Sequence, residues 1–263
     1  MDDLSFVDKS DFMFHRVSGK VTLKDGYYEI INESNLDFIW GNYYAFLNSA
    51  AITKHCRIED KSRSSSLEQQ SLNKNGFFAF SYNTDAKDLA LISEYQAKGF
   101  SLDIALGMVR TEPMLTISNE NLTLGIVNTD EEWQAVINNQ LNTSCLAKEE
   151  SVFLEKRFVD YQEMIEAGLG VWFYAKKDGR IVGNLGLFFD EGCARFQQVE
   201  TLAEARNQGV CQSLVSYAGN YCLNKLRMKC LIIVAEEGSI ASHIYQKLGF
   251  ETQLYTYSFL KLK

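Results

Sequence analysis

The sequence has few of the residues that build metal sites or disulfide frameworks. It contains three histidines in 263 residues, and its six cysteines form no Cys-x-x-Cys pair. We therefore expect no zinc site or other metal centre. The thiols are predicted to be scattered, reduced side chains of a cytoplasmic protein, namely Cys56, Cys145, Cys193, Cys211, Cys222 and Cys230.

Long apolar runs and excess positive charge are also missing. No segment approaches the roughly 18 apolar residues of a membrane span, and the opening MDDLSFVDKS does not resemble a secretory signal. The formal net charge of −8 argues against a nucleic-acid surface, which needs clustered lysine and arginine. We expect neither nucleic-acid nor membrane partners, so any anionic ligand must be bound by local donors.

Proline occurs once, at Pro113, in the stretch VRTEPMLTISNENLTLG. Polar, turn-prone residues here separate two apolar segments, which places a domain boundary near residues 112–121. We expect an N-terminal domain over residues 1–116 and a C-terminal domain over residues 117–263.

The C-terminal half alternates between strand and helix patterns. Helices are predicted over DEEWQAVINNQL and EESVFLEKRFVDYQEMIEAG, and a hairpin is predicted around Asp178-Gly179. A strand, ARFQQVETL, precedes a helix whose apolar face is Val210, Leu214, Ala218, Cys222 and Leu226. A buried strand (CLIIVA), a helix ending at Gly249 and an alternating final strand follow.

A short motif occurs once in each half of the chain. EYQAKGF (94–100) and IYQKLGF (244–250) share Tyr-Gln-x-x-Gly-Phe, and in each half an alternating strand pattern follows. The shared context favours two copies of one fold, although a match this short also arises by chance. The first copy lacks anything like the Arg-x-x-Gly stretch of the second.

That stretch, Arg206-Asn207-Gln208-Gly209-Val210-Cys211, lies between a predicted strand and a predicted helix. The start of a helix has unpartnered N–H groups and a partial positive charge, so it suits a phosphate. Gly209 would allow a ligand to approach the backbone closely. Alone, the Arg-x-x-Gly pattern favours an ordinary strand-to-helix turn over a phosphate site, and only its context of strand, helix and downstream tyrosine motif favours the phosphate site.

The order hairpin, strand, Arg-x-x-Gly turn, helix, strand, helix resembles the Gcn5-related N-acetyltransferase (GNAT) family over residues 121–263. The resemblance implies an α/β fold with a mostly antiparallel sheet flanked by helices, in tandem with a degenerate N-terminal copy. It also implies an acetyl-CoA site at Val199, Glu200, Thr201, Arg206, Asn207, Gln208, Gly209, Val210, Cys211 and Gln212, with the cofactor arm pairing along the first three. Cys211 replaces the usual glycine or alanine, and Gly238 replaces an asparagine that contacts the cofactor.

The resemblance also suggests catalytic residues. Tyr245 matches the family's general acid, with a buried aromatic as the alternative interpretation. Glu200 is a candidate general base, although a solvated or salt-bridged carboxylate is the simpler interpretation. His243 is expected at the surface, and Cys211 is not expected to be a nucleophile because no His-Asp partners are evident.

We therefore expect an acyltransferase that transfers acetyl from acetyl-CoA to an amine by direct attack. The alternatives are a non-catalytic acyl-CoA-binding module and a degenerate scaffold. The acceptor, a small-molecule amine or a peptide N-terminus, stays open, as does a homodimer. The aromatic stretch FIWGNYYAF (38–46) either lines the acceptor site or packs in the core.

Overall fold

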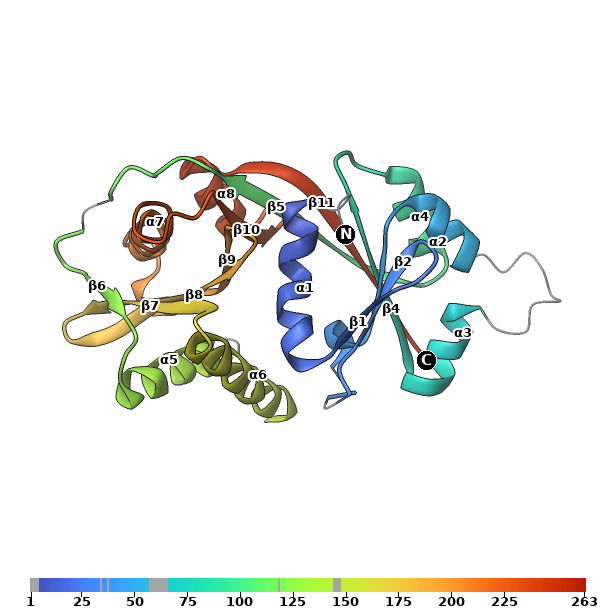
Figure 1. The fold of residues 1–263 in the computed structure, drawn as a ribbon, viewed down its shortest axis with the longest axis horizontal. Coiled ribbons are helices and arrows are strands. Elements are labelled where there is room, and N and C mark those ends of the chain that lie inside the picture. The colour runs from blue at the N-terminus through green and yellow to red at the C-terminus, as the bar shows by residue number, and fades with distance from the viewer. Residues whose placement is uncertain (1–4, 34, 37, 57–65, 118, 144–147) are drawn as a thin grey trace. The chain divides into compact units, whose positions relative to one another are not determined.

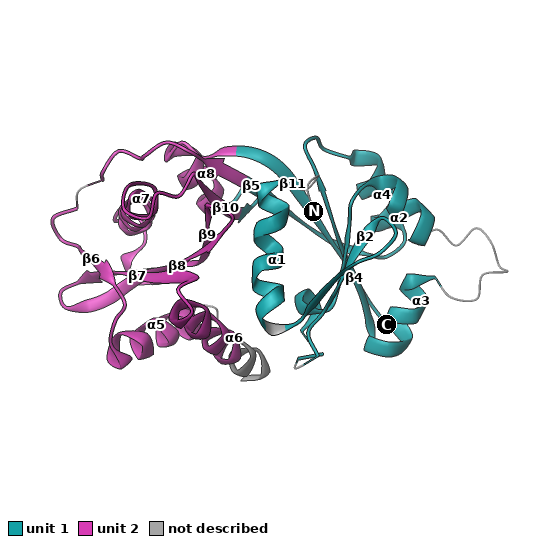
Figure 2. Cartoon of the chain, in the orientation of Figure 1, with its two compact units in different colours: residues 1–107, 235–239, 252–263 teal, residues 108–234, 240–251 magenta. Residues whose placement is uncertain are grey.

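The chain forms two compact units in a computed structural model that describes residues 5–33, 35–36, 38–56, 66–117, 119–143 and 148–263. Unit 1 contains residues 1–107, 235–239 and 252–263, and unit 2 contains residues 108–234 and 240–251 (Figure 2). The last strand of the chain therefore belongs to the unit that the N-terminal half builds.

Unit 1 is a sheet with helices against it. Its strands follow the order β1-β2-β3-β4-β11-β5, with β3 and β4 parallel and the other pairs from β1 to β11 antiparallel. Its elements are α1 (Phe6–Ser18), β1 (Lys20–Leu23), β2 (Tyr27–Ile31), the 3-10 turn η1 (Ile39–Gly41), β3 (Tyr44–Phe46), α2 (Ser49–Cys56), α3 (Leu67–Asn75), β4 (Phe77–Thr84), α4 (Leu89–Ala97), β5 (Ser101–Arg110) and β11 (Glu251–Leu262) (Figure 1).

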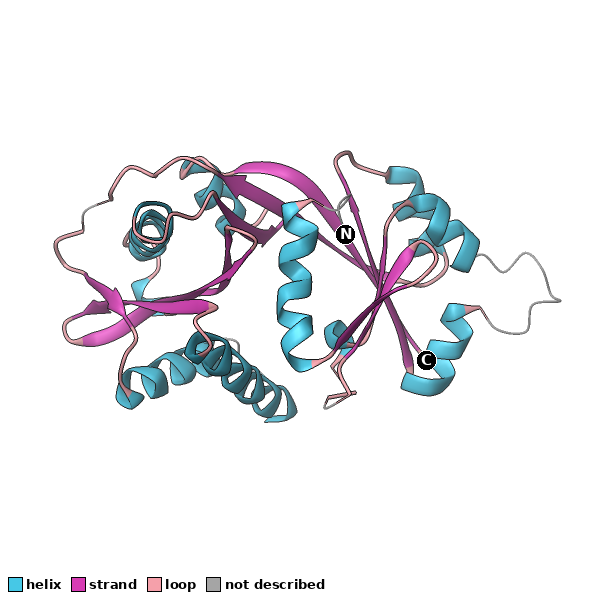
Figure 3. Cartoon of the chain, in the orientation of Figure 1, coloured by secondary structure: helices cyan, strands magenta, loops and turns pink. Residues whose placement is uncertain are grey.

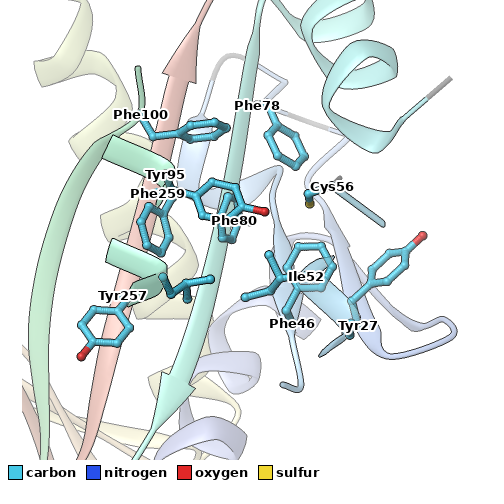
Figure 4. Packing of buried hydrophobic residues seen from close by; sticks show 12 residues of the cluster. Tyr27, Phe46, Ile52, Cys56, Phe78, Phe80, Tyr95, Phe100, Tyr257 and Phe259 are labelled. Atoms are coloured by element: carbon cyan, nitrogen blue, oxygen red, sulfur yellow. The ribbon is translucent and has the colours of Figure 1, made fainter. Parts of the chain in front are cut away.

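Strand β4 shows how side-chain alternation builds the core of unit 1. Phe78 and Phe80 point to one face and Phe77 and Ala79 to the other, because successive strand residues face opposite ways. The first face packs against α2, α4 and β11 in an aromatic cluster, with the rings of Phe80 and Phe259 stacked at 4.7 Å (Figure 4). The second face packs against Phe12 of α1.

Unit 2 has helices on both faces of its sheet, with α7 on one face and α5 and α6 on the other (Figures 1 and 3). The strand order is β10-β9-β8-β7-β6, antiparallel except for the parallel pair β10 and β9. Its elements are β6 (Thr123–Ile126), α5 (Asp130–Thr143), α6 (Lys148–Glu166), β7 (Gly170–Lys177), β8 (Arg180–Asp190), β9 (Cys193–Thr201), the 3-10 turn η2 (Ala203–Ala205), α7 (Val210–Asn224), β10 (Cys230–Glu236) and α8 (Ile240–Lys247).

The sequence patterns of the C-terminal half are confirmed, with one correction. The hairpin turns at Asp178 and Gly179, whose φ angles of 50° and 77° suit a tight two-residue turn. Helix α7 buries its predicted apolar face as far as Cys222. It ends at Asn224, however, so the expected extension of that face to Leu226 is wrong. The mixed α/β class, with a mostly antiparallel sheet flanked by helices, is confirmed.

The repeated Tyr-Gln-x-x-Gly-Phe motif is a way of ending a helix. After α4 the N–H of Phe100 donates to Tyr95 O at 3.1 Å, and after α8 the N–H of Phe250 donates to Tyr245 O at 3.0 Å. The intervening glycines have φ near +80°, the left-handed conformation of a Schellman motif. Helix α6 ends in the same way at Gly168 without sharing the sequence motif. The motif therefore reports local helix chemistry, and by itself does not establish a repeat.

The cysteines correct one expectation. Cys193 and Cys230 form a disulfide with a Cα–Cα distance of 4.7 Å, so the prediction that all six thiols are reduced is wrong for these two. They lie 37 residues apart in sequence but face each other at the starts of β9 and β10. Cys56, Cys211 and Cys222 are free, and Cys145 lies outside the described residues.

Candidate functional site

Strand β9 contains a β-bulge. Glu200 faces Asn184 and Gln197 faces Gly186, so Gln198 and Val199 together lie opposite the single residue Leu185 of β8. Gln198 has φ of +51°, a left-handed conformation that is uncommon outside glycine. A bulge bends its strand and redirects the side chains and peptide groups that follow.

The bulge coincides with the end of pairing between β9 and β10. The parallel register runs from Cys193 opposite Cys230 to Arg195 opposite Ile232. Strand β9 continues to Thr201 without further partners in that register. Residues Val199 to Thr201 therefore have no strand partner on the β10 side, which is the kind of edge to which an extended ligand segment can add, although both backbone groups of Thr201 already have partners within the protein.

Helix α7 begins at the loop that follows β9. Gly209 stands at the N-cap with φ of +77° and no side-chain cap. Within the described residues no protein acceptor meets the N–H groups of Val210, Cys211 and Gln212, as expected for the first turn of a helix. A β-carbon on Gly209 would meet only Asn119 Nδ2 at 3.7 Å, so this side of the loop is open. These features fit an anionic group.

Gln208 is the anchor of the loop. Its Oε1 accepts from Lys177 Nζ at 2.7 Å, and its Nε2 donates to Glu204 O at 2.8 Å. Its carbonyl oxygen accepts from Asn119 Nδ2 at 2.9 Å. Lys177 has no ion-pair partner among the described residues, so it places an uncompensated positive charge beside the start of α7.

Arg206 folds back onto β9. Its Nε donates to Thr201 O at 3.2 Å, and its guanidinium lies 3.6 Å from Glu200 Oε1. The same carboxylate oxygen accepts the Thr201 N–H at 2.9 Å. Arg206 therefore orders the turn between β9 and α7.

Glu200, Cys211 and Tyr245 form one electrostatic group. Burial raises the pKa of Glu200, against opposing effects from the Thr201 amide and Arg206. Burial and then the charge of Glu200 raise the pKa of Cys211 to about 12. Burial, Cys211 and Glu200 all raise the pKa of Tyr245, which is 4% exposed. At neutral pH Cys211 is thus a thiol and Tyr245 a phenol that retains its proton.

Comparison with known proteins identifies the domain that carries this site. Residues 168–252 match the family model described as an acetyltransferase (GNAT) domain. These residues form a GNAT domain. They span β7 to the start of β11 and include the bulge, the Arg206 loop and Tyr245.

Solved structures share the fold over a longer stretch. A GCN5-related N-acetyltransferase from Kribbella flavida aligns with a TM-score of 0.68 and 12% identity, covering 98% of this chain and 96% of that one. A functionally unknown conserved protein from Staphylococcus epidermidis aligns with a TM-score of 0.67 and 14% identity, covering 96% and 97%. A tandem GNAT protein from the clavulanic acid biosynthesis pathway aligns at 0.54 and 12%, covering 77% and 71%. No curated protein sequence matches the chain.

The fold is thus that of acyl-CoA-dependent N-acetyltransferases. Acetyl-CoA is the donor that GNAT enzymes use. In the described part of the chain, no cluster of three or more His, Cys, Asp or Glu side chains could hold a metal ion, and no helix is long and apolar enough to cross a membrane.

Several residues that contact the loop before α7 and the β9 bulge have no signal in the sequence. Lys177 and Asn119 both contact Gln208 in the loop before α7, and Gln140 reaches the bulge from α5. Each acts across a tertiary contact, so no local pattern marks it. His243 is exposed, as expected. The role of each predicted site residue stays a prediction.

Unit 1 contains a cavity of about 650 Å³ beside its own parallel pair, β3 and β4. Three carboxylates, Asp8, Asp11 and Asp85, line it, and no basic residue does so in the described part of the chain. The start of α2 is closed by Asn48, whose Oδ1 accepts the Ala51 N–H at 2.9 Å. Both features are unsuited to the phosphates of coenzyme A.

The aromatic stretch 38–46 contributes to the core of unit 1. Tyr43 and Phe46 are buried on the two faces of the sheet. Asn42 is 7% exposed and ties the stretch to the preceding loop, with Nδ2 donating to Asn35 O and Phe38 O, each at 2.9 Å. These contacts favour packing over an acceptor-lining role.

Proposed function

We propose that this protein transfers an acetyl group from acetyl-CoA to the nitrogen of an amine by direct attack. The observation that carries the proposal is the conjunction of two features within the GNAT domain. A bulged strand leaves its edge unpaired, and the next helix begins with open amides and Lys177 beside it. Together they suit an extended arm that ends in a pyrophosphate.

The chain would bind the donor through backbone groups. The edge from Val199 to Thr201 would pair with the pantetheine arm, and the amides from Gly209 to Gln212 would receive the pyrophosphate. The donor supplies an activated thioester carbonyl, which an N–H of the strand edge would polarise. The side chain of Gln208 is already engaged, so its contribution would come from its backbone.

Proton transfers would fall to two residues. The acceptor nitrogen forms a bond to the acetyl carbon, and its proton passes to Glu200 directly or through water. The carbon–sulfur bond breaks, and Tyr245 donates its phenolic proton to the departing sulfur. The raised pKa of Tyr245 keeps the phenol protonated at neutral pH, as a proton donor must be before the step, and the raised pKa of Glu200 suits a base that works nearer neutral pH.

Cys211 has no part in this scheme. Its raised pKa keeps the thiol protonated, and a covalent acyl-enzyme would require the thiolate. As a small residue in the first turn of α7, it takes the place of the glycine or alanine expected there.

Unit 1 is proposed to be a degenerate copy that binds no cofactor. Its acidic cavity and its capped α2 are the supporting observations. Isothermal titration with coenzyme A should therefore give one site per chain.

The decisive experiment pairs that titration with turnover of acetyl-CoA across a panel of small amines and peptide N-termini. Binding of coenzyme A together with turnover of acetyl-CoA supports the proposed N-acetyltransferase activity. Binding without turnover on any acceptor indicates a non-catalytic acyl-CoA-binding module. If coenzyme A does not bind, the proposal is contradicted and the degenerate scaffold is the remaining alternative.

A further inference from the structure

A buried amide on α5 reaches the bulge in β9. Gln140 is 1% exposed, and its Nε2 donates to the carbonyl oxygen of Gln198 at 2.9 Å. The same group donates to Asn184 Oδ1, also at 2.9 Å. Asn184 is fully buried on β8 and faces Glu200, next to the bulge. One side chain therefore connects a helix to both strands at the irregularity.

The surroundings of this contact are otherwise aromatic. Asn184 Oδ1 also accepts from Trp172 Nε1 at 3.2 Å, and the Trp172 ring lies 5.1 Å from that of Phe158. Asn184 Nδ2 is buried without a hydrogen-bond partner. A polar network that is only partly satisfied is less stabilising than apolar packing of the same shape. Its presence here favours a role beyond stability.

The bulge is a conformation that needs support. Gln198 holds a left-handed φ, and Leu185 faces two residues of β9. If β9 relaxed to a regular ladder, the register would shift by one residue, and every later side chain would change face. Val199 and Glu200 lie immediately after the irregularity and would both be redirected.

We infer that Gln140 is a positioning residue that holds the β9 bulge and thereby sets the strand edge, Val199 to Thr201, against which an acyl-CoA arm would pair. The inference rests on the proposed function for the identity of the ligand. Gln140 touches neither the proposed ligand nor the reacting atoms, and it acts through the Gln198 carbonyl.

Asn139, the preceding residue of α5, offers a matched control. It is 7% exposed, and its Nδ2 donates to Ile181 O at 2.8 Å, at the start of β8 and away from the bulge. Each variant removes a buried amide side chain from the same helix: Gln140→Leu loses the hydrogen bonds to Gln198 O and Asn184 Oδ1, and Asn139→Leu loses the one to Ile181 O. Both should lower the melting temperature, so stability alone does not separate them.

Two readouts separate them in the full-length protein. Amide hydrogen exchange of residues 197–201 should accelerate in Gln140→Leu and not in Asn139→Leu. The Kd for coenzyme A should rise about tenfold in Gln140→Leu. This is the effect expected if the displaced strand edge loses roughly one hydrogen bond of ordinary strength to the ligand. Asn139→Leu should keep the wild-type Kd.

The outcomes are distinct. If amide exchange at residues 197–201 is unchanged in Gln140→Leu, the positioning role is overturned, whether or not the Kd for coenzyme A changes. Faster exchange with an unchanged Kd also overturns it, because the bulge would then not set the ligand edge. Failure of the wild-type protein to bind coenzyme A contradicts the proposed function instead, and is visible before any variant is made.

Discussion

Tyr245 serves two purposes, one at the end of a helix and one in the proposed chemistry. Its carbonyl receives the Phe250 N–H that closes α8, and its ring packs against Phe250 at 6.3 Å. Its hydroxyl has no hydrogen-bond partner within the described residues. The structural purpose uses the backbone and the ring, and the chemical one uses only the hydroxyl, so mutation can separate them.

Tyr245→Phe should lower kcat by about a hundredfold, near the lower end of general-acid contributions, because a thiolate is already a fair leaving group. The KM should change less. The melting temperature should hardly move, since the ring remains and no internal hydrogen bond is lost. Steady-state kinetics and a thermal melt check this. Intact activity would assign the proton to another donor, and a joint loss of activity and stability would make Tyr245 a core residue only.

If Glu200 is the general base, the pH–rate profile of the reaction should fall on its acidic side (the acidic limb). A base works when deprotonated, so activity falls as the pH drops through its pKa. Burial raises that pKa above the ordinary 4.5, which places the limb at higher pH than for an exposed glutamate. The limb should be visible in the pH dependence of kcat/KM.

Glu200→Gln keeps the shape of the side chain and cannot accept the proton. It should lose rate at neutral pH and also lose this limb, while a limb from the acceptor amine itself would remain. If the acidic limb persists unchanged in Glu200→Gln, the base is elsewhere, and Glu200 serves only to pair with Arg206.

At the scale of elements, the start of α7 is the feature on which binding depends. Gly209→Glu should abolish the stabilisation by coenzyme A, about 2.7 kcal/mol at a hundredfold excess over Kd. It adds bulk and negative charge where phosphates are expected. The open space around Gly209 means that a clash with the protein itself is not the cause.

Gly168 provides the control, because it shares the backbone conformation and the open surroundings of Gly209. Its φ is +76°, and a β-carbon there would meet nothing within 4 Å. Gly168→Glu should therefore carry the same strain and charge but retain the full ligand-induced melting shift. Equal shifts in both variants would exclude the loop as the phosphate site.

At the scale of the whole molecule, the last strand joins the first unit. Strand β11 pairs with β4 from Tyr255 opposite Thr84 to Leu262 opposite Phe77, and Tyr257 and Phe259 are fully buried there. Helix α8, which precedes it, belongs to unit 2. The boundary expected at residues 116 and 117 therefore leaves unit 1 without one of its strands.

Separate expression of residues 1–116 and 117–263 should give poorly soluble fragments. The first lacks the partner of β4, and the second exposes the apolar face of β11. Co-expression should restore solubility, and a full-length chain cleaved at that bond after folding should stay assembled on size exclusion. Two fragments that are each folded and soluble would contradict this expectation.

The sequence by itself determined the features that depend only on residues close together along the chain. The helices, the Asp178-Gly179 hairpin, the glycine at the start of α7 and the Gly-Phe helix ends follow from periodicity and backbone preferences that span a few residues. Those signals also locate Arg206, Gly209 and Tyr245 in the chain.

Only the tertiary structure decided how distant segments meet. Gln140 donates to the carbonyl oxygen of Gln198 in the bulge across 58 residues, and Cys193 meets Cys230 across 37 residues. Strand β11 pairs with β4 from the other half of the sequence. Such contacts depend on which strands pair and in which register. That choice is settled by the burial of whole faces, and a local pattern does not encode it.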